Sequence, residues 1–211
     1  MRCLTCLFAV VFLVLFSAAP AYSIQLLYQT VRVNPTTGAV LGPGMDGPSE
    51  PTNSPGTGYG TALYDNVART LTLDCDFSGL GTDVGTGTSA SHIHAATTLP
   101  FQGTAGVATT TPSFVGFPLN VFAGTFHSVL DLTQASSWNP SYVTNNGGTT
   151  ATAEATFAAA MASGRAYWNI HSQRNGGGEI RGFFQLVPEP ATAAMALLAV
   201  LGLAGGFARR R

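Results

Sequence analysis

The 211-residue chain contains no lysine, and only 9% of its residues are charged. Its nine basic residues are therefore all arginines. Between residues 24 and 187, five arginines stand against nine acidic residues, which gives a net charge of −4. A protein that binds nucleic acid needs a basic surface to neutralise phosphates. We therefore expect no nucleic-acid partner.

Cysteine is also scarce, with Cys3 and Cys6 near the N-terminus and Cys75 alone in the remainder. A single cysteine cannot form an internal disulfide, and we expect Cys75 to be a small buried apolar residue. The first two cysteines belong to a segment that combines Arg2, a short apolar run and small residues up to Ser23. This arrangement is typical of a secretory signal peptide over residues 1–23.

Long apolar runs occur only at the two ends of the chain. At the C-terminal end an apolar segment, residues 191–208, is flanked by two short motifs. Their members are Pro188, Glu189 and Pro190 before the segment, and Arg209, Arg210 and Arg211 after it. An apolar segment of about 18 residues just spans a hydrocarbon core, and arginines hold its end in the cytoplasm. A membrane helix is therefore expected here.

This tripartite pattern resembles the PEP-CTERM sorting signal of Gram-negative bacteria. The resemblance implies an exosortase as partner, transient insertion of residues 191–208 in the inner membrane, and cleavage near the Pro-Glu-Pro motif. It also implies delivery to the cell surface or the extracellular space, where polysaccharide is a candidate partner. A plain C-terminal membrane anchor is the alternative.

The central part of the chain shows the period-two alternation of half-buried strands. In residues 70–77, for example, Leu71 and Leu73 alternate with Thr72 and Asp74. Strands are predicted at residues 24–33, 59–65, 70–77, 89–95, 123–132, 165–173 and 179–186. Residues 42–58 and 136–150 are predicted to be loops, and residues 151–163 a helix that ends at Gly164. The expected fold is an all-β antiparallel sandwich or barrel, immunoglobulin-like or superoxide-dismutase-like, with one short helix.

Residues 165–186 are predicted to form a closing hairpin around Asn175 and Gly176. If the loop holds an odd number of residues, the apolar side chains of the two strands lie on one face of the hairpin and the polar ones on the other. Such a loop places on one face Trp168, Ile170, Ile180, Phe184 and Leu186, and on the other His171, Glu179 and Arg181. We therefore expect the odd loop.

Three stretches, residues 50–80, 89–96 and 164–184, together resemble the CHRD domain of secreted proteins. The resemblance covers nearly all of residues 24–187, which we take as one domain, and departs from the family pattern in longer stretches at 97–120 and 136–150. It implies an extracellular β-domain whose biochemical role is not defined. The leading expectation is a non-enzymatic binding or structural role, without a cofactor.

Two of the four histidines, His92 and His94, would share one face of a strand. With His171 and Glu179 they form a candidate site for zinc or copper, which imidazole nitrogens bind well. The alternative is a hydrogen-bonded network that includes Arg181, whose charge would oppose a cation if it lay between the two groups. The His-x-His spacing resembles that of copper-zinc superoxide dismutase, but the resemblance implies more histidines than this chain has.

Two further functions have little support in the sequence. A serine hydrolase of the α/β class would need a G-x-S-x-G elbow, which the chain lacks. Asp74, Asp76 and Asp83 do not have the spacing of an EF-hand calcium loop. We expect these carboxylates to lie on a solvated strand face.

Overall fold

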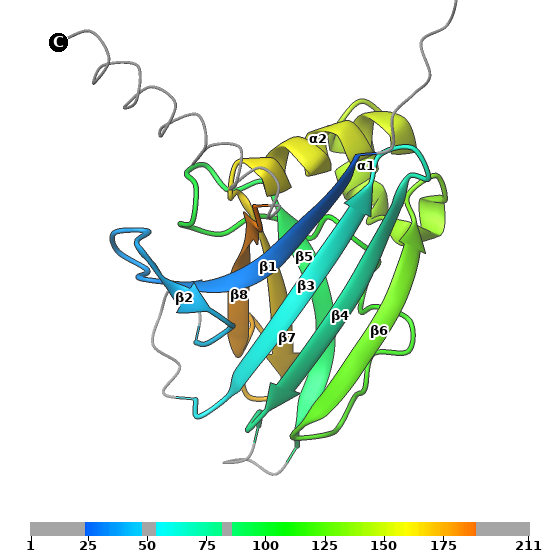
Figure 1. The fold of residues 1–211 in the computed structure, drawn as a ribbon. Coiled ribbons are helices and arrows are strands. Elements are labelled where there is room, and N and C mark those ends of the chain that lie inside the picture. Colours follow the sequence, from blue (N-terminus) through cyan, green and yellow to red (C-terminus); the bar gives the residue numbers. More distant parts are fainter. Residues whose placement is uncertain (1–23, 48–53, 82–85, 189–211) are drawn as a thin grey trace, which may run out of the picture.

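The computed structural model describes residues 24–47, 54–81 and 86–188 (Figure 1). The predicted signal peptide, residues 1–23, and the apolar segment, residues 191–208, lie outside the described residues, as do Glu189, Pro190 and the three terminal arginines. Among the helices of the described part, none is long and apolar enough to cross a membrane.

One antiparallel sheet of eight strands dominates the described residues and curls into a half-barrel (Figure 1). The strands are β1 Gln25–Val33, β2 Val40–Pro43, β3 Thr57–Asp65, β4 Thr70–Ser78, β5 Thr88–Ala95, β6 Gly124–Asp131, β7 Ala166–Ser172 and β8 Ile180–Leu186. Their order is β5-β7-β8-β1-β3-β4-β6, and β2 pairs with β1. The predicted antiparallel all-β fold is confirmed, with a single curled sheet in place of two facing ones.

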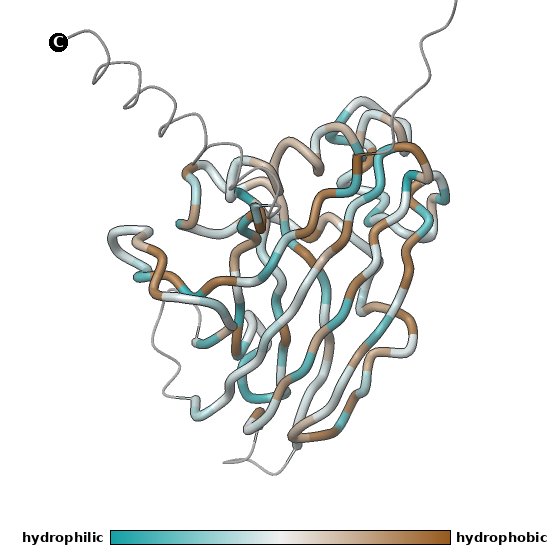
Figure 2. The backbone as a smooth tube through the Cα atoms, in the orientation of Figure 1, coloured by the Kyte–Doolittle hydropathy of each residue, from teal (hydrophilic) through white to brown (hydrophobic). Residues whose placement is uncertain are grey.

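The alternation of the sequence decides which face of each strand is buried. In β4, Leu71 and Leu73 are fully buried inside the curl, whereas Asp74 and Asp76 point outward and are exposed. Figure 2 shows apolar and polar segments alternating along the strands in the same way. In the closing hairpin, Ile170 pairs with Ile180 and Trp168 faces Gly182. This register is the one that the odd loop predicts.

Two helices cover one end of the curled sheet (Figure 1). The longer, α2 Thr150–Ala162, begins with a capping box between Thr149 and Thr152 and packs against β5, β7 and β8. Gly164, with φ +66°, follows its end as predicted. The chain before it also carries a short turn, η1 Ala135–Ser137, and a six-residue helix, α1 Pro140–Asn145.

The prediction of a loop over residues 136–150 is therefore wrong for α1. The helix forms because the Asn139 side chain accepts a hydrogen bond from the backbone N–H of Ser141, and Pro140 occupies the first turn. Strand β2 was likewise missed, because it lies partly in a Gly- and Pro-rich stretch. Leu186, expected in the core, is 43% exposed at the last position of β8.

The strands β5, β7 and β8 are covered on both faces. Their inner face carries Trp168 and Ile170, which belong to the main core. Their outer face carries Tyr167 and Phe183, which form a second apolar cluster with Val31 of β1, and Phe101 packs against it. The chain after β5 runs back along this edge strand, where Ala108 donates a backbone hydrogen bond to Ile93. All seven residues of β7 are consequently buried.

Candidate metal centre

Three histidines meet on the outer face of β5 and β7. His92 stands opposite Asn169 in the register of these two strands, and His94 stands opposite Tyr167. His171 lies two positions from Asn169 on the same face of β7. One ring nitrogen from each histidine lies within 4.8 Å of one from each of the others. The Nε2 atoms of His92 and His171 are only 2.9 Å apart.

Each of the three rings is held by a backbone carbonyl oxygen at its Nδ1 atom. The pairs are His92 with Pro112 at 3.1 Å, His94 with Ala105 at 2.7 Å and His171 with Gly176 at 2.9 Å. A carbonyl oxygen only accepts hydrogen bonds, so each Nδ1 carries the hydrogen and donates. In the neutral imidazole the lone pair then lies on the Nε2 atom. The three Nε2 atoms border one small space, because those of His92 and His171 are 2.9 Å apart and those of His94 and His171 both lie within 3.4 Å of the amide nitrogen of Asn169.

The environment keeps these rings neutral. The pKa of His92 is lowered to about 4, mainly by burial and also by the neighbouring His171 and His94, against the opposing effect of the Pro112 carbonyl. Burial also lowers the pKa of His94 to about 4 and lowers that of His171. At neutral pH no proton therefore remains to bridge the Nε2 atoms of His92 and His171. Two lone pairs facing each other at this distance repel unless a cation lies between them.

Asn169 borders the same space, although the candidate ligands named from the sequence did not include it. Its amide nitrogen lies 3.4 Å from Nε2 of His94 and 3.3 Å from Nε2 of His171, and it donates to the carbonyl oxygen of Gly177. Its Oδ1 atom is buried without a hydrogen-bond partner. The alternation of β7 carries the signal that would have found it, because residues 169 and 171 share a face.

The turn between β7 and β8 is shaped to receive Asn169. Gly178 has φ +118°, a backbone conformation that favours glycine. A Cβ atom at this position would lie 2.1 Å from Oδ1 of Asn169. Glycine is therefore required for the turn to close over the amide.

The structure does not bring Glu179, the fourth candidate ligand, to the imidazoles. The ladder between β7 and β8 ends at Ile170 and Ile180, and the chain turns away at Glu179. Both carboxylate oxygens accept from the backbone N–H of Gly81 at 3.0 Å, and one accepts from Ser54. Burial raises the pKa of Glu179, but these and further hydrogen bonds outweigh it and lower the pKa overall. Its role here is to hold the hairpin to the turn after β4.

Arg181 does not lie between the histidine groups. Its guanidinium stands over the ring of Tyr167, 5.0 Å from the ring centre, and donates to the carbonyl oxygen of Gly103. His94 stacks on the same ring at 4.7 Å with the planes 4° apart. Tyr167 is on β7, the strand between β5 and β8, so its ring separates the arginine from His94. The arrangement expected to exclude a cation, with Arg181 between the two histidine groups, is therefore not observed.

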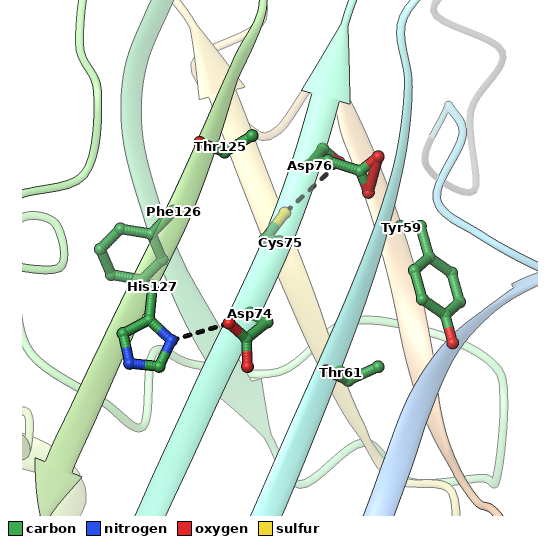
Figure 3. A pocket seen from close by; sticks show the side chains of 8 residues that line it. All are labelled: Tyr59, Thr61, Asp74, Cys75, Asp76, Thr125, Phe126 and His127. Atoms are coloured by element: carbon green, nitrogen blue, oxygen red, sulfur yellow. Dashed lines mark hydrogen bonds and ion pairs between the residues drawn. The ribbon is translucent and has the colours of Figure 1, made fainter.

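The fourth histidine, His127, lies elsewhere, in a shallow hollow on the outer face of β3, β4 and β6 (Figure 3). Its Nδ1 atom is 2.7 Å from Oδ1 of Asp74, and both side chains are more than half exposed. Asp76 and Tyr59 line the same hollow. Asp74 and Asp76 thus lie on a solvated strand face, as expected, while Asp83 is outside the described residues.

Comparison with known proteins gives two matches within the chain. The model of the CHRD domain matches residues 37–184, and the model of the PEP-CTERM protein-sorting motif matches residues 186–211. The second match contains the predicted sorting residues, from Pro188 to Arg211. Neither a curated protein nor a solved structure matches the chain significantly.

Proposed function

Because the chain belongs to the CHRD domain family and ends in a PEP-CTERM protein-sorting motif, we propose that it is an exported, exosortase-sorted surface protein whose domain binds a transition-metal ion. The sorting motif implies the export and the exosortase. The proposal concerns what the domain does after sorting. It has a binding role, and no reaction is assigned to it.

The convergence of three Nε2 lone pairs carries this proposal. Hydrogen bonds from the other ring nitrogen to carbonyl oxygens are the usual way in which proteins orient histidine ligands. Around a zinc ion with Zn–N bonds of about 2.0 to 2.1 Å, tetrahedral ligand nitrogens lie about 3.4 Å apart. The Nε2 atoms of His92 and His171 are 2.9 Å apart, and one ring nitrogen of each histidine lies within 4.8 Å of one from each of the others. These separations lie on either side of this value. Small rotations of the three rings would complete the site.

The surroundings favour a binding role over catalysis. His92 is 7% exposed and His171 is 8% exposed. The segment that follows β5 covers this face and supplies two of the carbonyl oxygens that hold the rings. A metal held here is shielded from large substrates.

Elemental analysis of the exported protein, purified without chelator, tests the proposal. We expect about one equivalent of zinc or copper per chain in the wild type and almost none in a His92→Ala, His94→Ala double variant. His127→Ala is the matched control, because this histidine lies outside the cluster, and it should keep the metal. Near-zero metal in the wild type, with no uptake from added zinc or copper, would leave only a hydrogen-bonded network.

We also propose extracellular polysaccharide as a second ligand, because the hollow of Figure 3 combines an aromatic ring with two carboxylates. Tyr59 is 38% exposed, so a sugar ring can stack on its face while hydroxyls donate to Asp74 and Asp76. Retention of the exported protein on immobilised polysaccharide from the producing cells tests this. We expect Tyr59→Ala to abolish retention, and equal retention of both proteins would contradict it.

A further inference from the structure

The ligand set of the histidine cluster carries no charge. Among the described residues, the only group of three or more His, Cys, Asp or Glu side chains close enough to hold an ion is His92, His94 and His171. Each is a neutral imidazole that donates from Nδ1 and has its lone pair on Nε2. A bound ion would therefore keep its full positive charge in a largely buried position.

A buried positive charge also acts on the cluster. Arg181 is 4% exposed and lies against the other side of the Tyr167 ring that His94 contacts. Its charge lowers the pKa of His94, after burial and the charge of His171. Asp46 exchanges backbone hydrogen bonds with Arg181 and attracts its charge, but it is not among the groups that shift the pKa of the three histidines. The charge of Arg181 therefore opposes a cation at the cluster, although the Tyr167 ring lies between them.

The charge of the ion enters twice in the free energy of binding. The cost of moving an ion from water into a medium of low dielectric rises with the square of its charge. The repulsion from Arg181 rises in proportion to its charge. Both effects are weaker for a monovalent ion than for a divalent one at the same three nitrogens.

Copper is the first-row metal that imidazole binds well and that is stable as a monovalent ion. We infer that the His92, His94 and His171 site is selective for Cu(I) over Zn²⁺, with the three Nε2 atoms as ligands. This inference rests on the proposed function, because it names the ion that the same cluster holds. Three ligands are sufficient for Cu(I), which binds at low coordination number.

Two competition titrations of the exported protein test the selectivity. Cu(I) is titrated without oxygen against bicinchoninate, and Zn²⁺ is titrated against a chromophoric zinc chelator at the same pH. We expect one Cu(I) per chain and an affinity for Cu(I) at least tenfold higher than for Zn²⁺. Binding of Zn²⁺ as tight as that of Cu(I) would overturn the selectivity and leave the metal site standing. Binding of neither ion would overturn the metal site itself.

The variant Arg181→Gln tests the electrostatic cause, with Arg181→Lys as the control that keeps the charge. Removing the charge should raise both affinities, and the factor for Zn²⁺ should be about the square of the factor for Cu(I). Equal factors would show that Arg181 does not discriminate between the ions. If Arg181→Gln does not fold, as judged by circular dichroism, the relative affinities of the wild type for Cu(I) and Zn²⁺ decide whether the site is selective.

Discussion

The hydroxyl of Ser91 on β5 accepts a hydrogen bond of 2.8 Å from the indole Nε1 of Trp168 on β7, and both side chains are fully buried. The indole ring also meets the edges of Phe114 and Phe126. The two strands that carry the candidate metal ligands on their outer face, β5 and β7, thus also contribute to the core on their inner face. Loss of packing around Trp168 would therefore disturb the core and the histidine cluster.

Truncation of Trp168 should strongly destabilise the fold. We expect Trp168→Ala to lower the free energy of unfolding by about 3 to 5 kcal/mol, because it leaves a cavity under a strand that is covered on both faces. Ser91→Ala removes this acceptor and the hydrogen bond that the hydroxyl donates to the carbonyl oxygen of Asn169. It should cost about 1 to 3 kcal/mol, since the indole N–H is left buried and unpaired. Urea unfolding curves measure both, and a near-neutral Trp168→Ala would contradict the assigned strand face.

A partly buried ion pair ties α2 to the turn between β3 and β4. Arg69 and Glu154 approach to 2.6 Å, and Glu154 also accepts from the hydroxyl of Tyr64. Arg69→Met leaves a buried carboxylate without its cation and should cost about 3 kcal/mol. The double variant Arg69→Met, Glu154→Leu should recover most of this loss, because no charge then remains buried.

The exposed pair of Asp74 and His127 is the control for that experiment. Both side chains face solvent, so His127→Ala should change the free energy of unfolding by no more than about 0.5 kcal/mol. Thermal melts and urea curves of the three variants measure the difference. A double variant as unstable as Arg69→Met would show that the loss does not come from the unpaired charge.

Much of the strand pattern could be predicted, because period-two alternation and burial on one side leave little choice of register. An odd number of residues in the loop between β7 and β8 correctly predicted that Trp168 lies inside and His171 outside. It also predicted that His171 lies near His92 and His94. The helix α1 was missed because a six-residue helix has too few positions to show periodicity. Its signal was the cap, Asn139 followed by Pro140.

The details of the site could not be predicted from residue types. The three acceptors that fix the imidazole hydrogens are backbone carbonyls, which every residue has. Their positions are set by the path of the segment after β5 for two of them and by the turn between β7 and β8 for the third. Glu179 seemed a ligand because alternation places it beside His171. The ladder stops one residue earlier, and the backbone N–H of Gly81 takes the carboxylate instead. Where a strand ends depends on tertiary contacts that alternation does not encode.

Processing of the C-terminus gives a prediction on the mass of the protein. Because the sorting motif covers residues 186–211, we expect protein recovered from the cell surface to lack residues 191–211. Intact-mass measurement determines the C-terminal residue directly. The presence of Arg209, Arg210 and Arg211 in the surface form would favour a plain anchor. A Pro188→Ala, Pro190→Ala variant should accumulate the uncleaved chain.

The last prediction concerns the metal-stripped protein in acid. The pKa of His92 lies near its ordinary value of 6.5 in the unfolded chain and at about 4 in the folded protein. Between these values the unfolded state binds more protons, so the folded state loses stability as the pH falls from about 6.5 to 4. A pKa difference of this size corresponds to a loss on the order of 3 kcal/mol for a single imidazole.

Urea unfolding of the stripped wild type at several pH values from 7.5 down to 4 measures this loss. Carboxylates titrate in the lower part of the same range, so the comparison with variants isolates the histidines. We expect a His92→Gln, His94→Gln double variant to lose much less stability over the range, because glutamine does not titrate. His127→Gln is the matched control, since that ring lies outside the cluster. Parallel curves for the wild type and the double variant would show that burial does not hold these imidazoles neutral, which removes the repulsion between lone pairs on which the metal site depends.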